Sequence, residues 1–256
     1  MKLQRCGTSD FEGSIAAWIM VLRTELAPLR ALGRRATSTR NLAKVTVLVE
    51  PISGRIVIAL EIFMPSAPSV VRLLAPRRFA DDRGWFCEVY NEKAFAEAGV
   101  DVRFVQDNHS LSRPVGVLRG LHFQTPPFGQ DKLVRCVAGA IFDVAVDVRK
   151  GSPTYGRWVG AELSAENGRQ LFIPIGFAHG FVTLTPNTEV TYKCSHFYAP
   201  AHDGGLRWDD PDLGIAWPLP PGAAPTLSPK DEKLPLLRDF DSPFVYDGVP
   251  LGELDR

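Results

Sequence analysis

The sequence predicts an all-β protein, a sandwich or barrel of antiparallel strands with few short helices. From residue 69 onward, ten short runs rich in β-branched and aromatic residues follow one another, separated by Gly, Pro, Asn or Asp. Only residues 91–99 among them have a helical pattern. So many strands with so little helix are typical of an antiparallel sandwich or barrel.

The expected strands in chain order are residues 69–74, 85–90, 103–112, 116–123, 132–139, 141–148, 157–163, 169–174, 179–185 and 189–195. Residues 141–148 show the pattern best: Phe142, Val144, Val146 and Val148 alternate with Ile141, Asp143, Ala145 and Asp147. This period of two predicts a strand with two different faces. In the helical segment we expect Asn91 to be the N-cap and Gly99 to end the helix. After Tyr198 the chain is rich in Pro, Gly and Trp, which predicts irregular structure around the barrel.

The sequence divides near residue 65, into an N-terminal extension of residues 1–63 and a β domain of residues 64–256. The extension contains a short amphipathic helix candidate at residues 15–22, an Arg-rich stretch, and apolar β-branched sequence over residues 44–63. Three interpretations of it stay open. It is a helix with an added hairpin, a flexible extension, or translated sequence upstream of a true start such as Met64.

Composition excludes several classes of protein. Lys and Arg number 29, as do Asp and Glu, so the chain has no net basic charge with which to bind nucleic acid in general. No apolar run reaches the roughly 20 residues that span a bilayer. The four cysteines are scattered without a CxxC motif, so we expect reduced thiols in a cytoplasmic protein.

Missing motifs narrow the chemistry further. The sequence has no GxGxxG, GxxxxGK[ST] or GxSxG motif, which argues against a dinucleotide cofactor, a P-loop and a serine-hydrolase elbow. Its five histidines form no HxH or HExxH pair. We therefore expect neither a metal nor a cofactor.

A strand with two polar side chains is the first candidate for a site. Arg119 and His122 lie within the otherwise apolar residues 116–123. A lone strand histidine is often a satisfied core residue, but a charged arginine in a barrel strand needs a partner. Strict alternation would place the two on opposite faces. A bulge at Gly120 would turn both inward, and this is our prediction.

Other polar residues stand in or beside the expected strands. Each also has a purely structural interpretation, such as a solvated strand end, a turn, a surface ion pair or a cap on the core. No single one is decisive. The set is Arg83, Glu88, Gln106, Asp107, Asn108, Lys132, His179, Tyr192, Tyr198, Lys230 and Asp231.

Taken together, these segments resemble one family. RGWFCEVYN, FVQDNHS, VLRGLHFQ, KLVRCVAGAIFDVAVDVRKGSPTYGRWVG, LSAEN, IPIGFAHGF, TYK and LSPKD occur in the order found in the dTDP-4-dehydrorhamnose 3,5-epimerase family, over about residues 69–237. The resemblance implies a cupin-type double-stranded β-helix (jelly roll), usually a homodimer with strands exchanged between subunits. It also implies a metal-free site inside the barrel.

The resemblance further implies roles for individual residues. His122 is the catalytic base, Asp231 holds it, Tyr192 is the general acid, and Lys132 lies near the sugar ketone. Tyr198 is expected to stack on the thymine ring, and Asp203, where the family often has Glu, to make a looser nucleotide contact. The remaining substrate contacts are Arg83, Glu88, Gln106, Asp107, Asn108, Arg119, His179 and Lys230.

The expected function is epimerisation at carbons 3 and 5 of dTDP-4-keto-6-deoxyglucose, on the route to dTDP-rhamnose and cell-wall polysaccharide. Both carbons flank a ketone, so loss of either hydrogen gives an enolate, and an imidazole of pKa roughly 6.5 is a suitable base. Four alternatives stay open. They are an epimerase that inverts one centre or acts on a related nucleotide sugar, a keto-isomerase, a non-catalytic sugar-binding jelly roll, and a metal-dependent cupin enzyme.

Overall fold

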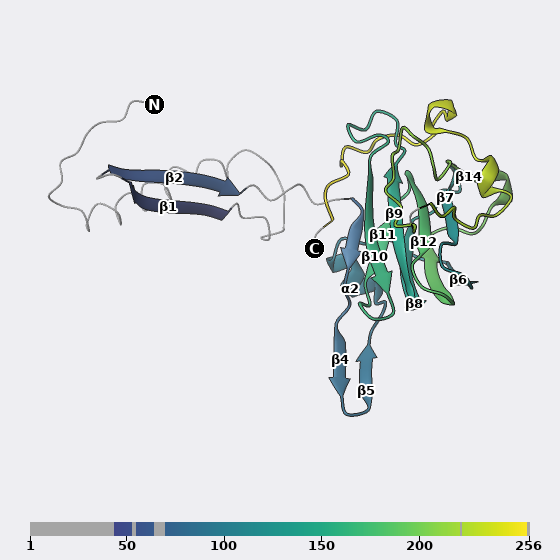
Figure 1. The fold of residues 1–256 in the computed structure, drawn as a ribbon, viewed down its shortest axis with the longest axis horizontal. Coiled ribbons are helices and arrows are strands. Elements are labelled where there is room, and N and C mark those ends of the chain that lie inside the picture. Colours follow the sequence, from purple (N-terminus) through teal and green to yellow (C-terminus); the bar gives the residue numbers. More distant parts are fainter. Residues whose placement is uncertain (1–43, 53–54, 64–69, 221, 255–256) are drawn as a thin grey trace. The chain divides into compact units, whose positions relative to one another are not determined.

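The computed structural model describes residues 44–52, 55–63, 70–220 and 222–254. The chain divides into two units, Met1–Pro65 and Ser66–Arg256. In the first unit, β1 (Lys44–Ile52) and β2 (Arg55–Phe63) form an antiparallel hairpin (Figure 1). The added hairpin is therefore present. The expected helix at residues 15–22, Cys6 and Met64 lie outside the described residues.

Two antiparallel five-stranded sheets build the second unit (Figure 1). The first has the order β10 (Trp158–Ser164), β9 (Ala140–Asp147), β12 (Phe177–Thr183), β7 (Leu118–Gln124) and β14 (Asp203–Gly205). The second has the order β3 (Arg72–Leu74), β11 (Gln170–Ile173), β8 (Lys132–Ala138), β13 (Thr188–Cys194) and β6 (Gln106–Ser112). Two packed antiparallel sheets of this kind form a jelly roll, which confirms the predicted fold class.

Smaller elements complete the domain. β4 (Arg78–Asp81) and β5 (Gly84–Cys87) form a hairpin that projects from the sheets (Figure 1). In α2 (Glu92–Glu97) the Asn91 side chain accepts a hydrogen bond from the Ala94 N–H at 3.1 Å, and Gly99 follows with a φ of +87°. The predicted cap and stop are confirmed. Short 3₁₀ helices η2 (Pro200–His202), η3 (Asp231–Lys233) and η4 (Leu237–Asp239) lie in the C-terminal part.

Every run predicted as a strand overlaps an observed strand, but two strands were not predicted. β14 is the sequence Asp-Gly-Gly, which has no β pattern and pairs with β7 through its backbone. β4 is a short, largely exposed strand with one aromatic residue, Phe79, and its partner β5 carries Trp85 and Phe86. Within the described residues, no helix is long and apolar enough to cross a membrane.

The two faces of β9 pack into two different cores, which explains its alternating sequence. Ile141 and Ala145 belong to the core between the sheets, and Val144 and Val146 to a second core. The second core is closed by C-terminal residues, among them Leu206, Leu213 and Phe244. Burial of each such aliphatic or aromatic side chain contributes about 1.5–3 kcal/mol. The irregular C-terminal part is therefore integral to the domain.

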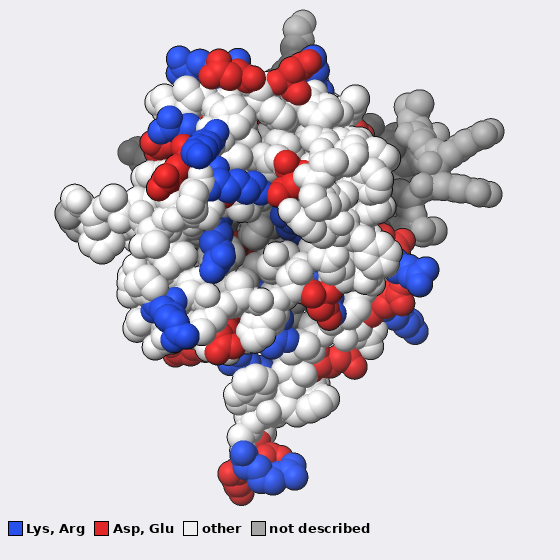
Figure 2. Space-filling model, turned by 90° about the vertical axis from the view of Figure 1, so that its right-hand side faces the viewer, with Lys and Arg blue, Asp and Glu red and all other residues white. Residues whose placement is uncertain are grey.

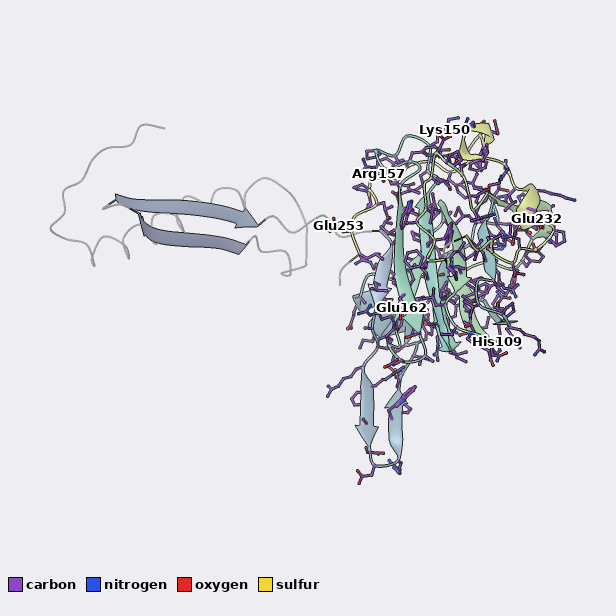
Figure 3. All side chains as sticks on the ribbon, viewed as in Figure 1. His109, Lys150, Arg157, Glu162, Glu232 and Glu253 are labelled. Atoms are coloured by element: carbon purple, nitrogen blue, oxygen red, sulfur yellow. The ribbon has the colours of Figure 1, made fainter. Side chains whose placement is uncertain are left out.

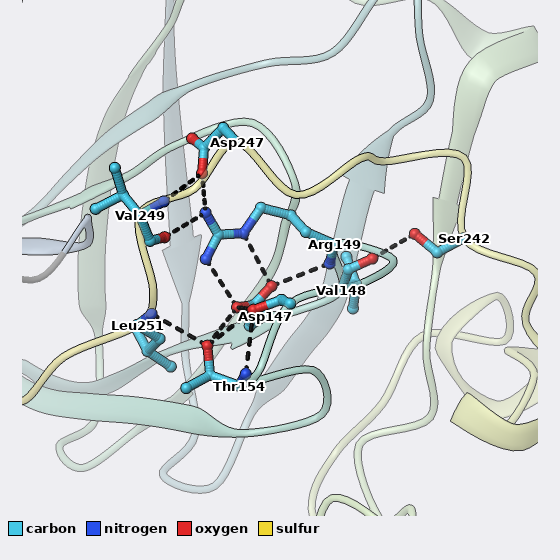
Figure 4. Close-up of polar contacts among 9 residues, drawn as sticks. Asp147, Val148, Arg149, Thr154, Ser242, Asp247, Val249 and Leu251 are labelled. Carbon is cyan, nitrogen blue, oxygen red and sulfur yellow. Dashed lines mark hydrogen bonds and ion pairs between the residues drawn. The ribbon is translucent and has the colours of Figure 1, made fainter.

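A buried arginine joins this C-terminal segment to the barrel (Figure 4). Arg149 is 2% exposed and donates to Asp147 from Nε at 3.0 Å and from Nη2 at 2.8 Å. Its Nη1 donates to Asp247 and to the Val249 carbonyl, at 2.8 and 2.9 Å. Burial tends to raise the pKa of Asp147, but the hydrogen bonds from Arg149, Ser152 and Thr154 outweigh it and lower that pKa.

Candidate active site

A cavity of about 570 Å³ opens between the two sheets, within the usual range for small-molecule sites. Figure 2 shows a hollow near the centre of this side of the molecule, with Lys and Arg side chains around it. Strands of both sheets and the segment before η3 line the cavity. The polar lining residues are Ser110, Ser112, Arg113, Arg119, His122, Lys132, His179, Tyr192, Thr226, Ser228, Lys230 and Asp231.

A His–carboxylate pair stands in this lining. His122 Nε2 lies 2.6 Å from Asp231 Oδ1, and the Asp231 side chain is 3% exposed. Ser228 Oγ accepts the Asp231 N–H at 3.2 Å and so orients the start of η3. Burial tends to raise the pKa of Asp231, but the hydrogen bond and charge of His122 outweigh it and lower that pKa. Asp231 is therefore a carboxylate at neutral pH that accepts the imidazole N–H.

The bulge predicted at Gly120 is present. In the pairing of β12 with β7, His179 is opposite His122 and Phe181 opposite Arg119, so β7 holds one extra residue there. Gly120 has a φ of +124°, and a Cβ on it would lie 2.5 Å from the Gly180 Cα. Only glycine fits this position. The extra residue brings Arg119 and His122 to the same cavity.

Lys132 and Tyr192 reach the cavity from the opposite sheet. Lys132 on β8 is 9% exposed. Burial lowers its pKa and outweighs the nearby negative charges, among them Asp203 and Asp143, which tend to raise it. Burial raises the pKa of Tyr192 on β13, so its hydroxyl keeps its proton at neutral pH. The cavity thus has a proton-accepting imidazole on one side and a proton-bearing phenol and an amine on the other.

A second His–carboxylate pair lies beside the first, and only its histidine was predicted. His179 Nε2 lies 2.7 Å from Asp143 Oδ1, and Asp143 is fully buried. Burial lowers the pKa of His179 and raises that of Asp143. Sequence reasoning selected His179 but not Asp143. The signal was available, because the alternation in residues 141–148 puts a carboxylate on the face that carries Ile141 and Ala145.

The nearby mouth of the barrel carries further predicted residues. Gln106, Asn108, Tyr198, Asp203 and Lys230 line an adjoining hollow of about 280 Å³ that shares His122, Lys132 and Tyr192 with the cavity. The Tyr198 hydroxyl donates to Asp203 at 3.2 Å, and Lys230 forms an ion pair with the same carboxylate. The Tyr198 side chain remains 57% exposed.

Three predicted residues are not brought to the cavity within one chain. Arg83 at the tip of the β4–β5 hairpin pairs with Asp81 at 2.5 Å, and Glu88 after β5 is exposed. Asp107 lies on the other face of β6 from Gln106 and Asn108, and it pairs with Lys193 at 3.0 Å. His109 shares that outer face, pairs with Glu189, and lies at the edge of the barrel (Figure 3).

Sequence reasoning also missed polar residues on β6 and in the segment before η3. Ser110 and Ser112 continue the inward set that begins with Gln106 and Asn108, so the period of two could have found them. The Ser110 Oγ is buried with no hydrogen-bond partner among the described residues. The described part of the chain contains no cluster of three or more His, Cys, Asp or Glu side chains suited to a metal ion.

Comparisons with known proteins agree with this fold. The family model described as dTDP-4-dehydrorhamnose 3,5-epimerase matches residues 69–239. A protein of that name from Sinorhizobium fredii is 56% identical over 176 residues, which is 69% of this chain and 89% of the relative. The one from Pseudomonas aeruginosa is 55% identical over 175 residues, or 68% of this chain and 94% of the relative.

Solved structures give the same result. The Bacillus anthracis enzyme with TDP and pyrophosphate bound is 52% identical with a TM-score of 0.63, over 65% of this chain and 94% of that one. The Legionella pneumophila enzyme in complex with dTDP-4-keto-L-rhamnose is 44% identical with a TM-score of 0.66, over 71% and 98%. A 3′-monoepimerase from Streptomyces bikiniensis with dTDP-quinovose is 39% identical with a TM-score of 0.62, over 67% and 87%.

Proposed function

Because the chain belongs to the dTDP-4-dehydrorhamnose 3,5-epimerase family, we propose that it inverts carbons 3 and 5 of dTDP-4-keto-6-deoxyglucose with its own His122 and Tyr192. It is an isomerase, and the product is dTDP-4-keto-rhamnose, the precursor of dTDP-rhamnose. One observation carries the assignment of residues. The 2.6 Å His122–Asp231 pair lines the same cavity as the partly buried Tyr192 and the buried Lys132.

His122 removes the proton next to the ketone. Its Nε2–H donates to the Asp231 carboxylate, so the other ring nitrogen, Nδ1, carries the lone pair that accepts a proton. As His122 becomes an imidazolium, the adjacent carboxylate stabilises the new charge, as in a catalytic triad. A positioned base of this kind typically contributes about a hundredfold to ten-thousandfold in rate.

Tyr192 returns a proton from another direction. It projects from β13 of the second sheet, whereas His122 projects from β7 of the first. A sugar ring bound between the sheets therefore meets the base and the acid on different sides, which inversion requires. The raised pKa of Tyr192 favours a phenol that holds its proton until the enolate forms.

Lys132 stabilises the enolate oxygen. Its buried amine lies in the cavity and donates hydrogen bonds, and a donor placed where charge develops is typically worth about 2.7–4 kcal/mol. Arg119 and Lys230 at the lining supply positive charge for the diphosphate. The exposed ring of Tyr198 offers a face for the thymine, and Asp203 orients that ring and Lys230 together.

We further propose a homodimer in which the β4–β5 hairpin of one subunit completes the site of the other. The hairpin projects from the sheets and leaves Phe79, Trp85 and Phe86 exposed by 52, 56 and 69%. Exposed apolar groups gathered on one element mark an interaction surface. The exchange would bring Arg83 and Glu88 to a substrate that they do not reach within their own chain.

A second candidate, a single-centre epimerase, is favoured by the 39% identity to the 3′-monoepimerase. One experiment separates the candidates: the full chain is mixed with dTDP-4-keto-6-deoxyglucose in deuterium oxide, and a reductase traps the product for proton NMR. Deuterium with inversion at both carbons supports the 3,5-epimerase. Deuterium at one carbon identifies the single-centre enzyme, and no exchange identifies a sugar-binding protein.

We propose that the protein works in the cytoplasm. Cys87, Cys136 and Cys194 are free, which is the usual state of thiols in a reducing compartment.

A further inference from the structure

Two His–carboxylate pairs place their imidazoles side by side in the cavity, and the proposed reaction uses only one imidazole as base. His122 and His179 are opposite each other in the pairing of β7 with β12, and both line the cavity. Each directs Nε2 to a carboxylate, at 2.6 Å in His122–Asp231 and 2.7 Å in His179–Asp143. Because two histidines at paired strand positions make the same kind of contact, we expect His179 to have a function as well.

Strand pairing holds Asp143 beside His179. In the antiparallel pair of β9 and β12, Asp143 is opposite Phe181, and His179 is opposite Ala145. Asp143 and His179 are therefore diagonal neighbours on one sheet face, within reach of long side chains. His179 is 6% exposed and Asp143 is 0% exposed, so solvent does not compete for their hydrogen bond.

Stability of the barrel does not account for Asp143. Its Oδ2 is buried and has no hydrogen-bond partner among the described residues. A buried charged group with an unpaired oxygen is unfavourable, and an apolar side chain of similar size would pack at β9 without that penalty. The carboxylate stands where its hydrogen-bond partner among the described residues, His179, faces the cavity.

The contact decides which ring nitrogen His179 presents. The charges of His179 and Lys132 oppose the effect of burial on the pKa of Asp143 and so favour the carboxylate. A carboxylate only accepts, so a neutral imidazole beside it carries its proton on Nε2 and its lone pair on Nδ1. Burial lowers the pKa of His179, which favours that neutral form. Nδ1 makes no hydrogen bond with the described residues and is not among their buried unpaired atoms, so it faces the cavity.

We infer that Asp143 is a positioning residue, which holds His179 in the Nε2–H tautomer so that Nδ1 accepts a hydrogen bond from a hydroxyl group of the bound sugar. The inference rests on the proposed function, since it requires a sugar in the cavity. Lys132, also in the cavity, donates hydrogen bonds only, so His179 supplies an acceptor that the amine does not.

Asp143→Asn tests the role directly in the full chain labelled with ¹⁵N-histidine. The amide can donate to Nε2, so the His179 ring should change from the Nε2–H to the Nδ1–H tautomer in the ¹⁵N spectrum. His179→Gln identifies the His179 signals by their loss. The kcat/KM for the keto-sugar should fall about ten- to a hundredfold, by analogy with the loss of carboxylates that orient metal-bound histidines. The change should lie mainly in KM. The hydroxyl does not react, so its contact with His179 stabilises the bound substrate and the transition state equally, and its loss weakens binding without slowing the chemical step.

Asp147→Asn is the matched control. Asp147 is as fully buried, on the same face of the same strand, but its partner is Arg149. Its loss should lower the melting temperature and leave the His179 tautomer and the kcat/KM within about twofold of the wild type. A double variant, Asp143→Asn with His179→Gln, should be no slower than His179→Gln alone.

Three results would overturn the role of Asp143. One is an Nδ1–H or doubly protonated His179 in the wild-type spectrum, which is readable even if Asp143→Asn does not fold. The others are an unchanged kcat/KM in Asp143→Asn, and additive losses in the double variant, which would mean that Asp143 acts through another group such as Lys132. Failure of the proposed function looks different: the wild type exchanges no deuterium into the sugar.

Discussion

Replacing Tyr192 by Phe should separate proton removal from inversion. Tyr192 packs against the core between the sheets, and its hydroxyl makes no hydrogen bond with the described residues. Phe fills the same space, so the free energy of unfolding should change by less than about 1 kcal/mol. The enolate still forms, because His122 and Asp231 are intact. His122 returns the proton to the original face, so deuterium exchange with retention survives.

The size of the inversion defect follows from the loss of one positioned acid. Such a group contributes about a hundredfold to ten-thousandfold, which corresponds to about 2.7–5.5 kcal/mol in the activation free energy. Water is a poor substitute because the Tyr192 side chain is partly buried against the core between the sheets. His122→Asn is the contrasting variant: its amide cannot accept the proton, so deuterium exchange and inversion should both fall by this factor.

The assay is proton NMR in deuterium oxide, with exchange at carbons 3 and 5 followed separately from formation of the reductase-trapped product. Circular dichroism and a thermal melt check that both variants fold. If Tyr192→Phe inverts the sugar at the wild-type rate, the acid is another group or a water molecule. If His122→Asn still exchanges deuterium at the wild-type rate, the base is a group other than His122.

Four further predictions test the architecture. Gly120→Ala should lower the free energy of unfolding by roughly 2–5 kcal/mol in denaturant titration, since it adds a Cβ 2.5 Å from Gly180 at a φ of +124°. Gly151→Ala, with a φ of +85° in open space, should lose only about 1–2 kcal/mol, and equal losses would argue against the bulge as a packing constraint. The lowered pKa of Asp147 means that its contribution to stability is present above the ordinary aspartate value of 3.8 and is lost as the pH falls through its lower folded-state pKa. Acid titration of the melting temperature should therefore be shallower in Asp147→Asn, and an unchanged profile would contradict a stabilising role of the Asp147–Arg149 ion pair. Deleting residues 1–63 should leave a folded, active enzyme, because the family match begins at residue 69, and loss of activity would show that the extension packs on the barrel. Light scattering should report about twice the chain mass at micromolar concentration, as an interface of 2,000 Å² or more implies, whereas an active monomer would exclude the exchanged hairpin.

Local pattern was enough to predict most of the fold. Alternation of side chains and the position of turn residues identified ten of the strands, and Asn91 and Gly99 marked the ends of the helix correctly. These features depend on backbone sterics and on hydrogen bonds within a few residues. β14 escaped prediction because its Asp-Gly-Gly backbone becomes a strand only when β7 offers a partner.

The candidate site was predictable in part for a different reason. His122 and Arg119 are three residues apart, and Gly120 between them implied a bulge, so a local rule was sufficient for that group. Contacts between residues far apart in the sequence do not follow from such local rules. The resemblance to a family, not the spacing, linked His122 with Asp231, which lies 109 residues along the chain.

By itself, the sequence determined which residues form strands, which of their side chains share a face, and that polar groups occur where a core is expected. Only the tertiary structure decided which polar groups meet. It brought Asp143 to His179 across 36 residues and directed Asp107 away from the cavity to Lys193. The physical reason is that a period of two specifies a face but not the neighbouring strand. The register between strands, shifted here by one extra residue in β7, then selects the partner of every buried charge.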